Sequence, residues 1–373
     1  MAVVLLAVVV FLAFSNGAND NAKGVASLYG SGTLRYRGAI AWATATTFAG
    51  SMAATFVAAA LLQRFTGKGL VPDALAATDA FACAVAAGAG VTVILATRLG
   101  FPVSTTHALT GAMVGSGWLG AADRVDVGVL GRSFVLPLVL SPILAIAFGA
   151  GLYLVLRHVR LRAGIDKAWC VCVGETTQLI AIARPASTLM VDAVRPPVTV
   201  RAGTTDTCAQ QYTGRVLGVD SEQLMNVLHV TSAGIVSFAR GLNDTPKMAA
   251  LLLVLPSWGA AGGMLTVAAA IALGGLLSAR RVAETMSHDI TSMNHGQGLS
   301  ANLATACLVI GASTFGWPVS TTHVSVGSLF GIGLTTRQAN TRVMRNILLS
   351  WLVTLPCAAL VSAAVSWAIG RVS

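Results

Sequence analysis

Charged residues are scarce in this chain. Only 10% of its 373 residues are Asp, Glu, Lys or Arg, while 55% are hydrophobic and the mean hydropathy is +0.76. Soluble globular domains carry about 25% charged residues. This number of charged residues is too small to cover the surface of a soluble domain. The composition therefore excludes a soluble globular domain and favours a chain embedded in a lipid bilayer.

Cysteine-based sites and nucleic-acid patches are also lacking. The net charge of +10 comes from Lys and Arg scattered among loops without interleaved aromatics, which argues against nucleic-acid binding. Six cysteines follow neither a four-ligand zinc spacing nor a familiar disulfide framework. Three of these, Cys83, Cys307 and Cys357, lie in apolar runs and are expected to pack there.

Long apolar runs, in contrast, are abundant. A membrane-spanning helix needs about 20 mostly apolar residues, and these runs lack the strict alternation of outer-membrane barrel strands. The first run, residues 2–14, lacks the basic start and the cleavage site of a signal peptide, so it is interpreted as the start of the first span. Five further candidate spans are residues 38–62, 81–99, 133–156, 259–278 and 346–369.

Two short polar sequences each occur twice. SNGANDNAK begins at Ser15 and FARGLNDTPK begins at Phe238, so Gly17 corresponds to Gly241 with an offset of 224. Pro-Val-Ser-Thr-Thr-His begins at Pro102 and again at Pro318, an offset of 216. The order is the same and the offsets nearly agree, which predicts two homologous membrane repeats, residues 1–156 and 224–373, joined by a linker at 157–223.

The basic residues predict how the repeats cross the membrane. Cytoplasmic loops gather Lys and Arg, and the basic loops fall on one side if each repeat crosses an odd number of times. The two termini are then outside, the linker is cytoplasmic, and the second repeat is inverted. We expect an all-α polytopic membrane protein with discontinuous helices and about 10–12 transmembrane segments. The linker is expected to be a small module with some strand content, because segments such as WCVCV, TLMVDAV and PVTVR alternate.

The Asn-Asp motifs predict breaks within helices. Asn, Gly and Asp are poor helix formers, and irregular backbone at membrane depth is tolerated only inside protein or beside a water cavity. Pro246 fits the first turn of a new helix. Asp20 and Asp244 are ionisable groups in apolar surroundings and therefore functional candidates, either as sodium ligands or as proton carriers, although capping of a helix at the interface is an alternative. The candidate sodium ligands are Asn19, Asp20, Asn243 and Asp244.

The Pro-Val-Ser-Thr-Thr-His motifs suit an anion. Proline favours a helix start, and the following hydroxyls and free backbone N–H groups offer donors at the positive end of the helix dipole. The alternative is that the hydroxyls only join packed helices. His107 and His323 could contact substrate, carry a proton or bond across helices, and a structural role is preferred. The predicted substrate-binding residues are Asn19, Asp20, Ser104, Thr105, Thr106, Asn243, Asp244, Ser320, Thr321 and Thr322.

The doubled motifs resemble those of the inorganic phosphate transporter family, whose members couple phosphate uptake to sodium or protons. The resemblance implies a homodimer of inverted-repeat subunits, with phosphate at the pseudo-symmetric centre and sodium beside it. The chain departs from the commoner GANDVAN pattern, because Lys23 and Lys247 stand where that pattern has Asn. We expect their ammonium groups to neutralise the anion or the aspartates and to weaken sodium dependence in favour of protons. The alternative is that both side chains snorkel to a membrane interface.

The predicted function is secondary active transport of inorganic phosphate across a bacterial inner membrane by symport with H+ or Na+, with alternating access around a central pseudo-symmetric site. No cofactor is expected, and a bound Na+ is left open. Sulfate is the alternative substrate, but it only accepts hydrogen bonds, whereas the candidate site contains acceptors that suit the hydroxyl of phosphate. A membrane-embedded enzyme is disfavoured, because acid and base roles need different environments and these residues are duplicated symmetrically. A passive channel is disfavoured, because channels use rings of several subunits.

Overall fold

The computed structural model describes residues 1–121, 125–165, 169–175, 198–204, 217–255, 258–290 and 293–372. The chain divides into two compact units. The first combines Met1–Tyr153 with His229–Ser373, and the second is Leu154–Leu228. Both predicted repeats therefore contribute to one helical unit, and the predicted boundaries at 156/157 and 223/224 stay a prediction.

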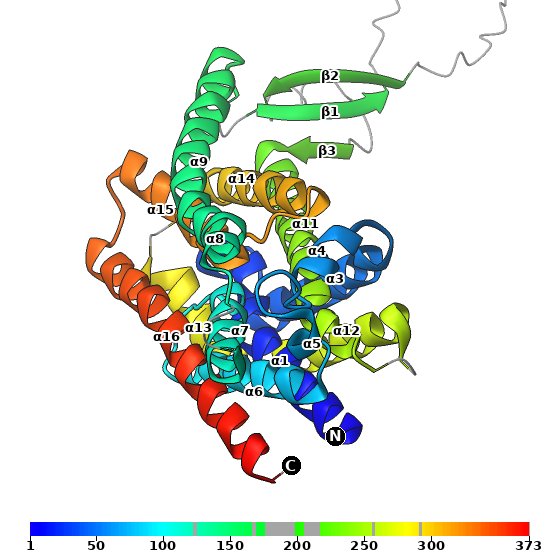
Figure 1. Ribbon diagram of the computed structural model, residues 1–373. Helices are drawn as coiled ribbons and strands as arrows, with labels where there is room; N and C mark the ends of the chain where they lie inside the picture. The colour runs from blue at the N-terminus through cyan, green and yellow to red at the C-terminus, as the bar shows by residue number, and fades with distance from the viewer. Residues whose placement is uncertain are drawn as a thin grey trace, which may run out of the picture. The chain divides into compact units, whose positions relative to one another are not determined.

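The first half of the chain forms a series of helices (Figure 1). Long uncharged apolar sequences favour helices at membrane depth, because a helix satisfies its own backbone polar groups. The elements are α1 (Ala2–Asp20), the 3₁₀ turn η1 (Asn21–Gly24), α2 (Ala26–Gly30), α3 (Tyr36–Val57), α4 (Ala59–Arg64), α5 (Asp73–Ala76), α6 (Asp79–Arg98), α7 (Thr105–Ala121), α8 (Val127–Val129), the π-helical segment η3 (Leu130–Val135) and α9 (Leu136–Arg162).

The second half repeats this helical character. Asn294 begins one of its helices with a capping box, in which its side chain and that of Gln297 each accept a backbone N–H of the other residue. The elements are α11 (Ser221–Ala249), the 3₁₀ turn η4 (Ala250–Leu252), α12 (Gly259–Ser278), α13 (Arg280–Glu284), the π-helical segment η5 (Thr285–Asp289), α14 (His295–Thr314), α15 (Thr321–Thr336) and α16 (Thr341–Val372).

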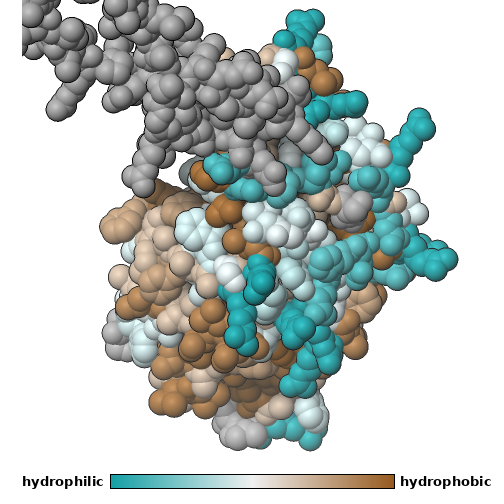
Figure 2. All heavy atoms as spheres, turned by 180° about the vertical axis from the view of Figure 1, so that it is seen from behind, coloured by the Kyte–Doolittle hydropathy of each residue, from teal (hydrophilic) through white to brown (hydrophobic). Residues whose placement is uncertain are grey.

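Six of the described helical segments are long and apolar enough to cross a membrane. Each overlaps one of the six predicted runs, although the run predicted at 38–62 is divided between α3 and α4. Figure 2 shows apolar side chains gathered over the lower part of one face. The chain is therefore a nearly all-helical membrane protein, as the composition predicted. The segments are Ala2–Gly24, Tyr36–Val57, Asp79–Arg98, Val127–Arg162, Gly259–Ser278 and Thr341–Arg371. The helices α7, α11, α14 and α15, which carry the motifs or adjoin them, are too short or too polar to meet the same criteria.

Glycines bring α1 close to its neighbour α12. α1 packs against α6 and α12. A Cβ added at Gly17 would overlap the backbone of Ile271, and one added at Gly274 would overlap the backbone of Phe14. Small residues allow this approach between membrane helices, where packing stabilises association. The end of α1 that carries the first Asn-Asp motif is thus held against α12.

Glycines also allow close approach between α7 and α16. A Cβ at Gly111 would overlap the backbone of Leu355, and one at Gly115 would overlap the backbone of Ala359. These two helices share an extensive contact, which Figure 1 shows as the C-terminal helix running alongside α7. The helix that follows the first Pro-Val-Ser-Thr-Thr-His motif is therefore fixed against the C-terminal helix.

The predicted helix breaks hold for one copy of the Asn-Asp motif. In the first copy α1 ends at Asp20 and a 3₁₀ turn follows. In the second copy α11 continues through Pro246 to Ala249, so the prediction of a new helix at that proline is wrong. Proline removes only one backbone hydrogen bond, and the adjacent Thr245 hydroxyl is satisfied by Ser51 Oγ at 2.7 Å.

The helices after the two prolines start later than a proline in the first turn would require. α7 begins at Thr105 and α15 at Thr321, three residues beyond Pro102 and Pro318. The serine that precedes each helix accepts a hydrogen bond from the backbone N–H of the histidine three residues on. Serine is a preferred N-cap, because its hydroxyl satisfies a backbone donor of the first turn.

The second unit contains a three-stranded antiparallel sheet in the order β2-β1-β3. Its strands are β1 (Trp169–Glu175), β2 (Val198–Thr204) and β3 (Leu217–Asp220). Trp169 pairs with Thr204, and Cys170 pairs with Asp220. The strand content predicted from WCVCV is confirmed, whereas the TLMVDAV segment lies outside the described residues.

The three cysteines in apolar runs differ in environment. Cys83 on α6 is buried, as expected. Cys307 and Cys357 are exposed, so the expectation that they pack inside is wrong for both. An apolar run in a membrane helix does not require burial in protein, because one side of the helix can face lipid.

Replacing Gly274 by Ala tests the close approach of α1 and α12. The added Cβ would meet the backbone of Phe14, so we expect destabilisation of about 1–3 kcal/mol, the usual cost of overpacking. The matched control is Gly151→Ala on α9, where a Cβ meets nothing within 4 Å. Thermal unfolding of the two purified variants in detergent measures the difference, and equal melting temperatures would contradict this packing.

Candidate functional site

Five acidic and basic side chains are buried in the part of the chain that the structure describes. These Asp, Lys and Arg side chains are each between 1% and 3% exposed, and all five lie in the two Asn-Asp motifs. A buried charge costs several kcal/mol unless it is paired and hydrogen-bonded, so such a group of side chains must satisfy one another or a ligand. The five are Asp20, Lys23, Arg240, Asp244 and Lys247.

Lys23 lies in an oxygen-rich environment. The turn η1 follows α1 directly and places Lys23 three residues after Asp20. Its Nζ donates to Asn19 Oδ1 at 3.0 Å and to the carbonyl oxygen of Val103 at 2.8 Å. It also donates to Asp20 Oδ1 and to the hydroxyl of Thr322. One ammonium group is thus surrounded by amide, carbonyl, carboxylate and hydroxyl oxygens.

Lys247 has an equivalent environment in the second half. Its Nζ donates to Thr106 Oγ1 at 2.8 Å, to the carbonyl oxygen of Val319 at 2.8 Å and to Asp244 Oδ1 at 3.3 Å. The Nδ2 group of Asn243 donates to Asp244 Oδ1 at 3.0 Å. Both predicted charge-compensating lysines are therefore buried and paired with aspartate, which excludes the alternative that they snorkel to an interface.

Each lysine binds a threonine from the other half of the chain. Lys23 reaches Thr322 in the second Pro-Val-Ser-Thr-Thr-His copy, and Lys247 reaches Thr106 in the first. Both copies of Pro-Val-Ser-Thr-Thr-His therefore meet both copies of the Asn-Asp motif in one cluster. This convergence is what the duplicated sequences predicted, and it ties the two halves together through reciprocal contacts.

Two further hydroxyl residues form hydrogen bonds with the motif asparagines Asn19 and Asn243. Asn19 Nδ2 donates to Thr97 Oγ1 at 2.9 Å, and Ser313 Oγ donates to Asn243 Oδ1 at 3.1 Å. Sequence reasoning missed Thr97 and Ser313. Their positions differ by 216, the offset of the Pro-Val-Ser-Thr-Thr-His copies, so extending the repeat alignment upstream of those motifs would have found them.

Asn16 joins the two aspartates. Its Nδ2 lies 3.2 Å from Asp20 Oδ2, 3.4 Å from Asp244 Oδ2 and 2.9 Å from Thr105 Oγ1. Asn16 lies directly before Gly17 in the first motif, but it was not among the predicted site residues. Because one amide nitrogen contacts both carboxylates, the two Asn-Asp motifs form a single cluster.

The remaining predicted hydroxyls border this cluster. Thr321 Oγ1 donates to Asp244 Oδ2 at 3.4 Å. The Ser104 and Ser320 hydroxyls cap α7 and α15, accepting backbone N–H groups at 3.1 and 3.2 Å. The N-termini of both helices therefore lie where their threonines meet the lysines and aspartates, with the positive ends of their dipoles near the cluster.

The two motif histidines contact each other. The ring centroids of His107 and His323 are 4.6 Å apart, and His323 also stacks on Trp351 of α16 with centroids 3.9 Å apart. His323 Nδ1 lies 3.0 Å from the carbonyl oxygen of Leu138. Within the described residues, His107 Nδ1 and His323 Nε2 have no hydrogen-bond partner. The pair thus joins helices from both halves, and Trp351 is a further residue that the sequence did not reveal.

The residues predicted to bind sodium are the right chemical types. Sodium, as a hard cation, takes oxygen ligands, and carboxylate, amide, carbonyl and hydroxyl oxygens are all present. In this structure Asn19, Asp20 and Asp244 accept hydrogen bonds from the lysine ammonium groups, whereas Asn243 Oδ1 accepts one from Ser313 Oγ. No group of three or more His, Cys, Asp or Glu residues suited to a metal occurs among the described residues.

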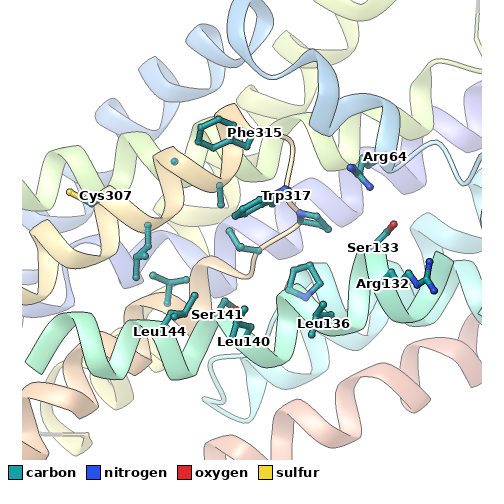
Figure 3. A pocket seen from close by; sticks show the side chains of 17 residues that line it. Arg64, Arg132, Ser133, Leu136, Leu140, Ser141, Leu144, Cys307, Phe315 and Trp317 are labelled. Carbon is teal, nitrogen blue, oxygen red and sulfur yellow. The ribbon is translucent and has the colours of Figure 1, made fainter. Parts of the chain in front are cut away.

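A separate groove lies between α9 and α14 (Figure 3). It has a volume of about 570 Å³ and is lined mainly by apolar side chains, with Arg64 and Arg132 at one end. Val319, whose carbonyl oxygen binds Lys247, also lines this groove. The groove therefore adjoins the buried cluster without containing its charges.

A sequence profile of the phosphate transporter family matches residues 16–362. The chain belongs to this family. A protein of Pyrococcus abyssi named as a phosphate permease is 28% identical over 398 residues, covering 96% of each chain. A protein of Rhizobium meliloti named as a low-affinity inorganic phosphate transporter is 29% identical over 372 residues, covering 96% of this chain and 93% of its own.

A solved structure has the same fold. It is titled as the sodium-dependent phosphate transporter, and it matches with a TM-score of 0.75 over 100% of this chain and 99% of its own, at 22% identity. The resemblance stated from the doubled motifs is thus confirmed at the level of the family. The match also agrees with the nearly all-helical membrane fold.

Removing a threonine hydroxyl tests the reciprocal contacts. Thr106→Val and Thr322→Val would each remove an acceptor from a buried ammonium group. Hydrogen bonds to charged groups contribute about 1.5–3 kcal/mol, so we expect each variant to lose about that much stability.

The matched control is Thr335→Val on α15, because the Thr335 hydroxyl bonds only the Gly331 carbonyl oxygen of its own helix at 2.9 Å. Thermal unfolding in detergent gives the comparison. Site variants as stable as the control would mean that the hydroxyls do not hold the lysines.

Proposed function

We propose that this chain transports inorganic phosphate across the membrane, with the buried cluster as its substrate site. The single observation that supports this function is the convergence of all four motif copies on one group of buried charges and hydroxyls. The described cluster joins Asp20 to Asp244 through Asn16, and it is bordered by the N-termini of α7 and α15. Family membership supports phosphate as the substrate.

The acceptors of the cluster favour phosphate over sulfate. Phosphate near neutral pH carries a hydroxyl and can both donate and accept, whereas sulfate only accepts. The carboxylates of Asp20 and Asp244 and the amide oxygen of Asn16 are acceptors at the centre of the cluster. We therefore propose phosphate as the substrate and keep sulfate as the second candidate.

Two cations are candidates for coupling. The solved relative of similar fold is titled as sodium-dependent. In this chain the Lys23 and Lys247 ammonium groups already interact with the oxygens that a sodium ion would use. We propose that these ammonium groups replace bound sodium and that a proton gradient drives uptake by symport.

We further propose alternating access of two inverted repeats around this site, in a homodimer. The reciprocal lysine–threonine contacts support a pseudo-symmetric centre, because equivalent groups from each half play equivalent parts. In Figure 1 both chain termini lie at the same end of the helical unit, which supports two termini on one side of the membrane. We propose that this side is outside and that the linker is cytoplasmic. A symmetrical transport site requires no separate acid and base, so we propose no enzymatic activity.

Gradient-driven uptake tests the function. Labelled phosphate should accumulate in proteoliposomes under an inward proton gradient, and excess unlabelled sulfate should compete only weakly. An imposed sodium gradient without a proton gradient should give little uptake. Uptake that sulfate abolishes would move the substrate to sulfate, and the absence of uptake under either gradient would refute transport by symport. Protein-free liposomes are the control.

Replacing Lys23 by Asn tests the role of the ammonium group. The variant has the residue of the commoner family motif, leaves Asn19 and Asp20 without their cation, and opens an oxygen-lined position. We expect weaker uptake under a proton gradient and a gain of sodium stimulation. Lys68→Asn, at an exposed loop residue, is the control. Unchanged phosphate affinity and unchanged cation dependence in Lys23→Asn would refute the replacement of sodium by lysine.

A further inference from the structure

Arg240 is the buried charge that the lysine–aspartate pairs do not account for. It lies on α11 one helical turn before Asp244 and is 2% exposed. Its Nη2 donates to Asn21 Oδ1 and to Thr47 Oγ1, each at 3.1 Å. Its Nε and Nη1 have no hydrogen-bond partner among the described residues. Buried donors are almost always satisfied in proteins, so these two nitrogens indicate a missing partner.

The neighbours of Arg240 are neutral. Thr47 Oγ1 donates to the carbonyl oxygen of Ser237 at 3.1 Å, and Asn21 Nδ2 donates to Thr44 Oγ1 at 2.8 Å. These groups orient the guanidinium but bring no negative charge. Among the described residues, Arg240 on α11 thus donates hydrogen bonds to uncharged oxygens of η1 and α3.

The charges of the cluster do not balance. Three basic side chains, Lys23, Arg240 and Lys247, accompany two acidic ones, Asp20 and Asp244, so the formal charge of the five buried groups is +1. Each lysine is directly paired with its own aspartate. The excess positive charge therefore falls on Arg240. Because an uncompensated buried charge is costly, an arriving anion would be favoured at this position.

The position of Arg240 is also where the two halves differ. With the offset of 224, Arg240 corresponds to Asn16. Asn16 Nδ2 is directed at two carboxylates, which fixes the amide orientation, and its Oδ1 has no partner among the described residues. The equivalent positions thus offer unpartnered donors in one half and an unpartnered acceptor in the other. An anion that also carries a hydroxyl matches this combination.

We propose that Arg240 is the main anion-binding residue of the buried cluster, donating from Nε and Nη1 to the oxygens of a tetrahedral oxyanion. The inference rests on the proposed transport function and names the residue that supplies the affinity of the site for phosphate. Arginine suits this role because it stays charged and its donors match phosphate oxygens. Asn16 Oδ1 then accepts the hydroxyl of a protonated phosphate, which a sulfate ion lacks.

The test compares Arg240→Gln and Arg240→Lys with the wild-type protein. The control is Arg280→Gln, at a residue whose side chain is 76% exposed and forms an ion pair with Glu284. Phosphate and sulfate are titrated against each purified protein, with the thermal shift in detergent as the binding readout, and KM for phosphate is measured in proteoliposomes. We expect Arg240→Gln to weaken phosphate binding and raise KM about 10- to 100-fold, as the loss of hydrogen bonds to a charged group requires. Arg280→Gln should match the wild type.

Arg240→Lys separates binding from structural charge balance. It keeps the charge but has a different donor geometry, so we expect a folded protein with weakened phosphate binding and a raised KM. If Arg240→Gln does not fold and Arg240→Lys binds phosphate as tightly as the wild type, the charge of Arg240 has only a structural role, and the inference is overturned. A lowered melting temperature with unchanged KM in Arg240→Gln would overturn it in the same way.

The outcomes for the wild type distinguish this inference from the function on which it rests. If phosphate binding is normal in the wild type and in Arg240→Gln, transport stands and the inference fails. If the wild type binds sulfate but not phosphate, and Arg240→Gln abolishes that binding, the anion site stands and the phosphate assignment fails. If neither anion shifts the melting temperature of the wild type, both are overturned.

Discussion

The structure depends on keeping charge paired at membrane depth. Asp20 and Asp244 could not be buried to 1–2% exposure without cations, and each has a lysine three residues further along the chain. In the first half a 3₁₀ turn follows the aspartate, and that geometry eclipses side chains three residues apart. The second half reaches the same pairing within a continuous helix. The local backbone thus differs between the halves while the charge pairing is kept.

That pairing also holds the rest of the cluster in place. Each ammonium binds the carbonyl oxygen of the valine before a Ser-Thr-Thr sequence in its own half, and a threonine in the opposite half. The loops that start α7 and α15 are thereby fixed to the Asn-Asp segments. The relative movement of the two halves would have to exchange these contacts for others, and an incoming anion is a suitable replacement partner for the ammonium groups.

The sequence predicted the membrane helices and singled out most of the motif residues that meet in the candidate site, but it did not single out every residue that the structure places there. Composition alone identifies spans such as α12, because an uninterrupted apolar run has few other stable environments. Duplication singled out the aspartates and lysines. Arg240 and Trp351 were missed because neither recurs at its equivalent position, and their importance comes from contacts between distant helices. The course of α11 through Pro246 was mispredicted, because a proline removes only one backbone hydrogen bond and the helix continues past it.

The glycine contacts between α1 and α12 have a mechanical consequence. Phe14 and Gly274 meet backbone to backbone, and Gly17 lies against Ile271 in the same way. The nearest atoms at both contact points are backbone atoms, which cannot change rotamer to absorb a displacement. Asn19 and Asp20 follow Gly17 by two and three residues, so a shift of the first Asn-Asp motif must carry α12 with it. The two helices therefore move as one rigid body. A displacement caused by binding at the first Asn-Asp motif is then transmitted along the length of α12.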